Sequence, residues 1–102
     1  MSARVSNGYA DSSGKYHQTV RVFLRNTGNA AFSGSKVLSI AVTGCSEIRH
    51  VGCTTENARN ISYSGSSIVL TYYQSGLSVN GDDPITLTVI SDQPITSVSC
   101  VI

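Results

Sequence analysis

The sequence is poor in the features that would indicate a helical, strongly charged or membrane-spanning protein. It has no Trp, one Met and two Pro, and only 13% of its 102 residues are charged. The formal net charge of +1 is too small to supply the basic field that nucleic acids and anionic membranes require, so we expect neither as a partner. No apolar run approaches the roughly 20 residues of a membrane span, and the first five residues lack the apolar stretch of a signal peptide.

β-branched and hydroxyl-bearing residues take the place of charge. The chain has 11 Val, 8 Ile, 9 Thr and 17 Ser, against 5 Leu and 6 Ala. β-branched side chains favour strands and crowd a helix, and no segment keeps apolar residues at helical spacing for two turns. The length fits one small domain. We therefore expect residues 1–102 to form a single all-β domain, an Ig-like antiparallel sandwich of seven or eight strands.

Alternation along the chain predicts which residues face the core. In the longest alternating segment, residues 16–26, His17, Arg21 and Phe23 share the face that we expect to be wet. Shorter strand-like segments cover residues 36–43, 68–73, 85–90 and 98–102. The side chains expected in the core are Val20, Val22, Leu24, Leu38, Ile40, Val42, Leu70, Leu87 and Val89.

The three cysteines, Cys45, Cys53 and Cys100, bear on the compartment of the protein. We expect a Cys45–Cys53 disulfide, which would close a short loop and stabilise it by roughly 2–3 kcal/mol. Cys100 would then be a buried thiol, although its pairing with either of the other two stays open. The sequon at Asn60 also fits an oxidising, extracellular compartment, so we expect secretion.

The sequence contains no spacing of ligand residues that is typical of a metal site. The two nearby cysteines and His50 offer soft ligands, but their spacing matches no zinc motif. The adjacent Asp82 and Asp83 lack the alternating spacing of a calcium loop. We expect a plain turn there instead, with Gly81 at a positive φ, and we expect neither a metal nor a cofactor.

Catalytic residues are equally sparse. The only side chains that titrate near neutrality are His17 and His50, and neither is accompanied by a nucleophile elbow or a glycine-rich cradle. The six acidic residues, two of which a glycosidase would need on opposite sides of a cleft, lie mostly in expected turns. We therefore expect no enzymatic activity.

Aromatic residues are the strongest candidates for ligand contact. A sugar ring stacks its C–H groups on a flat aromatic face, while its hydroxyls bond to amides and hydroxyls around it. Phe23 is a candidate because it alternates onto the polar face, although core burial competes with ligand binding for Tyr72 and Phe23 alike. The expected ligand-binding residues, in order of support, are Tyr72, Tyr73, Tyr16 and Tyr9, with Gln74 at the rim.

Three segments, residues 16–28, 37–42 and 76–89, resemble the bacterial type-two cellulose-binding modules and the related domain that ends some plant and slime-mould cellulases. The resemblance implies an Ig-like β-sandwich that binds a polysaccharide. Such modules usually bind crystalline cellulose through a row of exposed Trp, which this chain lacks. The resemblance therefore implies that Tyr rings, in place of Trp rings, stack on the sugars.

Together these observations predict a secreted, non-catalytic module that recognises a neutral polysaccharide, such as cellulose or chitin, by tyrosine stacking. The alternative is an Ig-like extracellular domain for protein contact, adhesion or matrix structure. In that case Phe23, Arg21 and Arg25 would form part of a protein-facing patch. The two functions differ in whether several Tyr lie exposed and coplanar on one face of a sheet.

Overall fold

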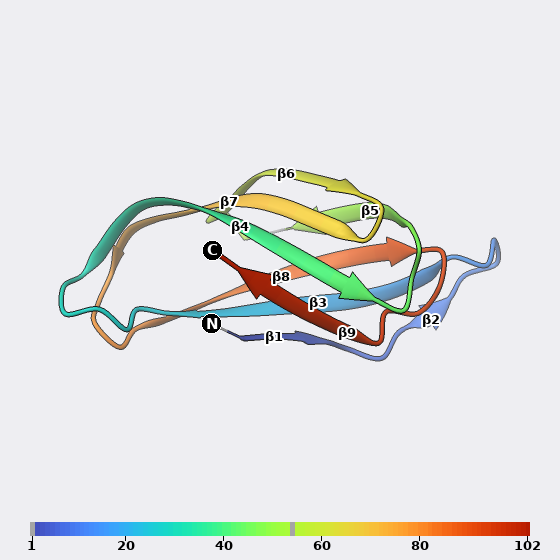
Figure 1. Cartoon of the computed structure of the whole chain (residues 1–102), viewed down its shortest axis with the longest axis horizontal. Coiled ribbons are helices and arrows are strands. Elements are labelled where there is room, and N and C mark those ends of the chain that lie inside the picture. Colours follow the sequence, from blue (N-terminus) through green and yellow to red (C-terminus); the bar gives the residue numbers. More distant parts are fainter. Residues whose placement is uncertain (1, 54) are drawn as a thin grey trace.

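The computed structural model describes residues 2–53 and 55–102, which form two packed antiparallel sheets (Figure 1). The expected all-β sandwich is confirmed, with nine strands in the described residues instead of seven or eight. Within the same residues no helix is long and apolar enough to cross a membrane. The strands are β1 (Ser2–Val5), β2 (Tyr9–Ala10), β3 (Tyr16–Arg25), β4 (Phe32–Thr43), β5 (Ile48–Cys53), β6 (Ala58–Ser64), β7 (Ser67–Leu77), β8 (Asp82–Ser91) and β9 (Ser97–Val101).

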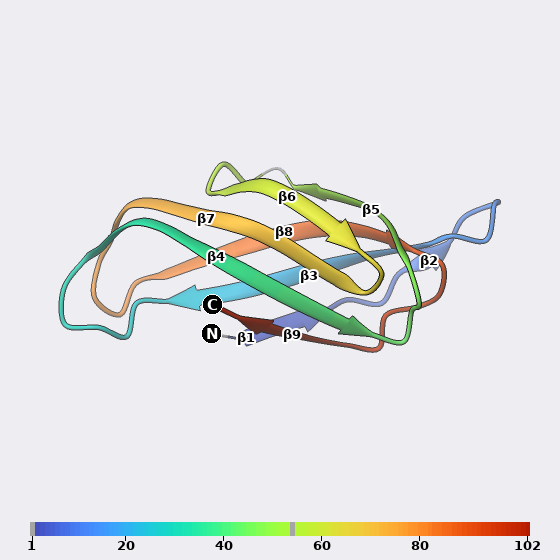
Figure 2. The same ribbon diagram turned by 45° about the horizontal axis from the view of Figure 1, so that its top comes forward.

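The two sheets differ in strand order and meet along both flanks. The five-stranded sheet has the order β1-β3-β8-β5, with β2 also paired to β3, and the four-stranded sheet has the order β6-β7-β4-β9. β3 and β8 pair along ten residues, from Tyr16 opposite Ser91 to Arg25 opposite Asp82. β1 lies near β9 on one flank and β5 near β6 on the other (Figures 1 and 2). The resulting body is elongated, 47 × 21 × 19 Å.

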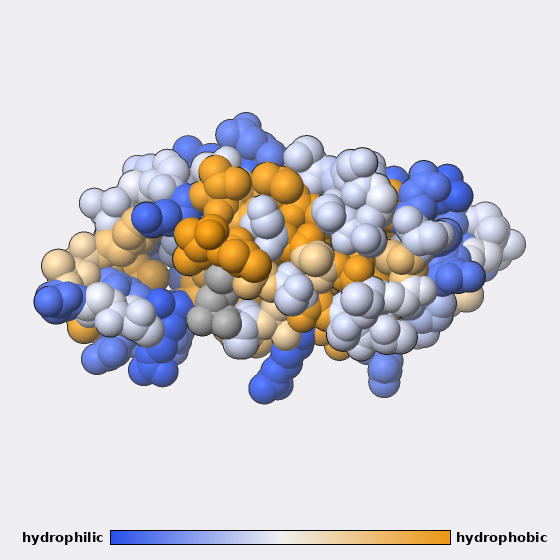
Figure 3. Space-filling model, in the orientation of Figure 1, coloured by the Kyte–Doolittle hydropathy of each residue, from blue (hydrophilic) through white to orange (hydrophobic). Residues whose placement is uncertain are grey.

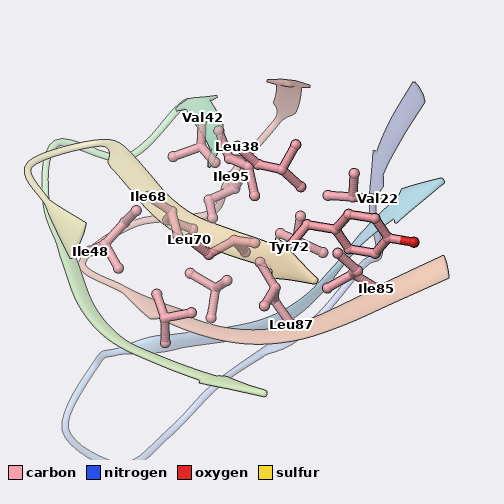
Figure 4. Packing of buried hydrophobic residues seen from close by; sticks show 14 of the residues in the cluster. Val22, Leu38, Val42, Ile48, Ile68, Leu70, Tyr72, Ile85, Leu87 and Ile95 are labelled. Carbon is pink, nitrogen blue, oxygen red and sulfur yellow. The ribbon is translucent and has the colours of Figure 1, made fainter. Parts of the chain in front are cut away.

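The core lies between the sheets and is built from alternate residues of the long strands, as Figure 4 shows. All nine side chains that the alternation predicts as core are buried. Six further residues complete the core: two from β5, two from β7, one from β8 and one from the connection before β9. The buried hydrophobic residues are Val20, Val22, Leu24, Leu38, Ile40, Val42, Ile48, Val51, Ile68, Leu70, Tyr72, Ile85, Leu87, Val89 and Ile95.

Gln18 is a polar residue on the core face of β3, and its amide is fully used. Its Nε2 donates to the backbone carbonyls of Ser6 (3.0 Å) and Ile95 (2.9 Å), and its Oε1 accepts from the backbone N–H of Ile95 (2.7 Å). A buried amide is tolerated when its donors and acceptor are paired in this way. Gln18 thereby ties the β1–β2 and β8–β9 connections to the centre of the five-stranded sheet.

The turn before β8 differs from expectation at one residue. Asn80 has the positive φ, 62°, in place of Gly81, and Asn tolerates this region better than other residues with a side chain. Gly81 is required for another reason: a Cβ there would lie 2.8 Å from the carbonyl oxygen of Ser78. The turn therefore uses its glycine for close approach of the backbone.

Candidate functional site

Of the expected ligand residues, Tyr72 belongs to the core and Gln74 is partly buried beside it. The Tyr72 side chain is 3% exposed, stacks on Phe32 with centroids 6.2 Å apart, and donates its hydroxyl hydrogen to Asp83 Oδ2 at 2.8 Å. Burial, together with the neighbouring Asp83, raises the pKa of Tyr72 to about 12. Gln74 Nε2 donates to the same carboxylate oxygen at 2.9 Å. With 3% of its side chain exposed, the Tyr72 ring lacks the open face that the expected stacking role requires.

The other three expected tyrosines do not converge on one surface. Tyr73 points away from the core on the four-stranded sheet, where the Arg59 guanidinium lies 4.5 Å from its ring centroid. Tyr16 is half-buried at the start of β3 and donates its hydroxyl hydrogen to the carbonyl of Gly8 at 3.1 Å. Tyr9 is 63% exposed on the five-stranded sheet. These residues therefore form no coplanar row of exposed Tyr, so the arrangement that would distinguish a polysaccharide-binding module is not found, and any stacking depends on a single ring.

The structure instead gathers polar and aromatic side chains on the outer face of the five-stranded sheet, along β3. Two hollows lie there, of about 410 Å³ and about 180 Å³. They share Ser6 and Thr19 as lining residues, so they adjoin along β3, and we call the two together the β3 groove. Its outward-facing side chains are Arg4, Ser6, Tyr9, His17, Thr19, Arg21 and Phe23.

One end of the β3 groove is an aromatic platform. The Tyr9 ring lies against the His17 imidazole with centroids 4.8 Å apart and planes 3° apart, because the two residues are directly opposite in the β2–β3 pairing. The close pairing depends on Gly8, where a Cβ would lie 1.7 Å from the His17 carbonyl oxygen. With one ring face against His17 and 63% of the side chain accessible, Tyr9 offers its second face to a ligand.

Asp11 fixes the imidazole beneath this platform. Its Oδ2 lies 2.8 Å from His17 Nε2, and its Oδ1 accepts from the backbone N–H of Ser13 (2.9 Å) and of Lys15 (3.1 Å). These contacts hold the pKa of Asp11 well below its usual range, with the His17 hydrogen bond as the largest cause and the Ser13 hydroxyl as the second. The carboxylate and the tight turn therefore orient His17, and His17 supports Tyr9.

The other end of the β3 groove carries Phe23 and two arginines. Phe23 is 37% exposed, and the Arg4 guanidinium carbon lies 5.8 Å from its ring centroid. Arg4 and Arg21 are direct cross-strand neighbours in the β1–β3 pairing. Alternation along β3 places Phe23 and Arg21 outward, as the sequence predicts, but the register that sets Arg4 opposite Arg21 has no sequence signal.

The expected Cys45–Cys53 disulfide is absent, and the fold gives the reason. Residues 48–53 form strand β5 where a loop was expected. The extended strand carries Cys53 about 16 Å away from Ile48, so the chain does not turn back towards Cys45, as a disulfide with Cα atoms within about 7 Å requires. The alternative pairings fail as well. Cys100 lies on β9, where it pairs with Ile40 of β4, and β9 and β5 lie on opposite flanks of the sandwich. No disulfide joins the three cysteines.

The same geometry separates the soft ligands considered for a metal. β5 holds His50 and Cys53 apart from Cys45, and the described residues contain no group of three His, Cys, Asp or Glu side chains that would hold an ion. Burial, with the nearby charge of Asp92, raises the pKa of the Cys45 thiol. Burial likewise raises the pKa of Cys100. Both thiols are therefore mostly protonated and weakly nucleophilic near neutral pH.

The chain matches no family model, and no curated protein sequence matches it. Among solved structures, a chitinase of Bacillus thuringiensis contains a similar fold, with a TM-score of 0.54 and 12% sequence identity. The match covers 98% of this chain and 14% of the chitinase chain. At this identity the likeness shows a shared fold. The resemblance to type-two cellulose-binding modules thus has no family match behind it.

Proposed function

We propose that the chain is a secreted, non-catalytic carbohydrate-binding module whose ligand lies in the β3 groove and stacks on Tyr9. The observation that carries the proposal is an exposed tyrosine ring held flat by His17 at the end of a groove lined with small hydroxyl side chains. Sugar rings are recognised by this combination of an aromatic face and neutral hydrogen bonds. The fold shared with part of a chitinase chain is compatible with that function.

A neutral polymer of the cellulose or chitin type is the ligand class that we propose for the Tyr9 end. Beside Tyr9 the groove offers the Ser6 and Thr19 hydroxyls and the Asn7 amide, all of them uncharged. A single tyrosine platform supplies only modest binding energy, so we expect dissociation constants on the order of 10–1,000 μM.

The non-catalytic part of the proposal is supported by the state of His17. Its Nε2 is bonded to Asp11 and its ring is covered by Tyr9, and the Ser13 hydroxyl donates to Asp11 in place of contacting the imidazole. A nucleophile needs a hydrogen-bonded base, and this arrangement does not provide one. Incubation with the polymers that the protein binds should therefore release no reducing sugar ends.

Retention on polymers with matched tyrosine variants tests the proposal. The wild-type protein should be retained on chitin, cellulose or xylan, and Tyr9→Ala should weaken retention about tenfold, the loss expected for one stacked ring. Tyr73→Ala is the matched control, because Tyr73 lies on the other sheet. Unfolding midpoints should stay equal. An equal loss in both variants, or no retention of the wild type on any polymer, would overturn the proposal.

Protein contact is the second candidate function, and one surface favours it. The outer face of the four-stranded sheet exposes Val37, Val69 and Val101, and Val69 and Val101 flank Ser39 on its two sides. Figure 3 shows apolar surface gathered around the C-terminal end of β9 and the adjoining part of β4. Apolar patches of this kind occur at protein interfaces. Failure to bind any polymer would make protein contact the leading function.

A further inference from the structure

The Arg4–Arg21 pair in the β3 groove is electrostatically unfavourable in the protein alone. The two residues are directly opposite on β1 and β3, so their Cβ atoms lie about 4.5–5.5 Å apart on the same face. Like charges in this position destabilise a sheet. The cation–π contact of Arg4 with Phe23 orients one guanidinium but leaves both positive charges in place.

Neither arginine has a carboxylate partner in the described part of the chain. The ion pairs found there join His17 to Asp11, Arg25 to Asp82 at 3.8 Å and Arg49 to Glu47 at 3.6 Å. Asp82, the acidic residue paired in register with the end of β3, is thus already opposite Arg25. The larger hollow of the groove, about 410 Å³, is consequently lined by two cations and no anion.

We propose that this hollow is a subsite for an anionic substituent of the bound polysaccharide, a carboxylate or a sulfate ester. The inference deepens the proposed carbohydrate function and rests on it. Guanidinium groups bind carboxylates and tetrahedral oxyanions through paired N–H donors, and an anion between Arg4 and Arg21 offsets their mutual repulsion. Phe23, beside the pair, offers a ring on which the sugar that carries the anion can stack.

The two ends of the groove then recognise different chemistry. Ser6 and Thr19 connect them, and six residues of β3 separate His17 from Phe23, on the order of 20 Å along the strand. One extended chain can therefore contact both ends. Neutral sugars bind at Tyr9, and an acidic substituent further along the chain binds at the arginines. A polysaccharide is favoured over an acidic peptide because the groove joins two aromatic faces through hydroxyl side chains.

Soluble cellulose derivatives that share one backbone separate the charge contribution from sugar recognition. Hydroxyethylcellulose is the neutral probe, carboxymethylcellulose and cellulose sulfate are the anionic probes, and poly-glutamate is the peptide probe. At low salt the anionic derivatives should bind about threefold to tenfold more tightly than the neutral one. This gain should shrink towards the neutral value at 0.5 M salt, because exposed charges are screened. The affinities for carboxymethylcellulose and for cellulose sulfate, compared with each other, show whether the subsite prefers a carboxylate or a sulfate ester.

Paired charge variants assign the gain to the arginines. Arg4→Gln with Arg21→Gln should abolish the gain, so that the anionic derivatives bind this variant no more tightly than hydroxyethylcellulose does, and its unfolding midpoint should not fall, since a repulsion is removed. The control, Lys36→Gln with Arg59→Gln, changes the net charge equally on the four-stranded sheet and should keep the gain. Persistence of the gain in the arginine variant, its loss in the control, or equally tight binding of poly-glutamate would refute the anionic glycan subsite.

The outcomes also separate the two proposals. Binding of the neutral polymer without any gain from acidic groups refutes the subsite alone. Arginine-dependent binding of the anionic polymers without neutral binding supports the subsite and refutes the neutral ligand at Tyr9. Absence of binding to every cellulose derivative counts against both.

Discussion

Replacement of Gln18 by Leu tests the idea that one buried amide fastens two connections to the five-stranded sheet. Leu is close to Gln in volume, so packing loss is small, while three hydrogen bonds disappear. Ile95 is 3% exposed, and its N–H and carbonyl both lose their partner. Each buried group left unpaired costs about 1–3 kcal/mol, which gives a loss of about 2–6 kcal/mol in the free energy of unfolding. Small domains have only about 5–15 kcal/mol in total.

Urea unfolding at 25 °C measures this loss, and Gln93→Leu is the control because Gln93 is exposed in the same β8–β9 connection. With a urea dependence of about 1–3 kcal/mol per molar, the midpoint should fall by about 1 M or more. Gln18→Glu adds a second readout: a carboxylate would face two carbonyls, so its pKa is raised and stability should increase as the pH is lowered. A Gln18→Leu loss below about 0.5 kcal/mol, similar to the control, would refute the reasoning.

Four further predictions follow from the core, the thiols, the buried phenol and the close backbone approach. Val22→Ala should cost about 2–4 kcal/mol in urea unfolding because Val22 is fully buried. Alkylation after unfolding without reductant should modify all three cysteines, and a mass lower by two hydrogens would contradict the structure. In an absorbance titration Tyr72→Phe should remove an ionisation step near pH 12. Gly8→Ala should lose polymer binding as Tyr9→Ala does, because its Cβ would push β2 from β3, whereas Gly76→Ala, with open space around it, should not.

Strands with regular alternation were predictable from the sequence, and irregular strands were not. Residues 16–26 separate apolar from polar positions so cleanly that every core assignment on β3 is confirmed. β5 and β6 contain Gly, Asn and Ser and carry register shifts in their pairing. Their extended form comes from backbone pairing with β8 and β7, which is a property of the assembled sheets. The disulfide prediction was wrong for this reason, since it took residues 46–52 for a loop.

The residues of the candidate site divide in the same way: alternation predicts which side chains face outward, and the contacts between strands are not predictable from it. Alternation places Phe23 and Arg21 outward, and it gives Tyr72 the same face as Leu70, which was expected in the core. The ring contact of Tyr72 with Phe32 from β4, forty residues away in the sequence, could not be predicted from this local pattern. The Tyr9 platform and the arginine pair likewise depend on cross-strand register, which no local pattern of residues encodes.

The placement of the chain ends determines how this fold responds to tension. β1 starts and β9 ends at the same side of the molecule, and Figures 1 and 2 both show the two ends close together. A force applied between them pulls β1 from β3 and β9 from β4 starting at the strand ends, so the interstrand hydrogen bonds break one after another. Loading of all bonds at once, which makes some β-sandwiches mechanically strong, does not occur in this geometry. A protein pulled by these two ends would yield first at the flank where β1 and β9 meet, and β1 carries Arg4 of the β3 groove.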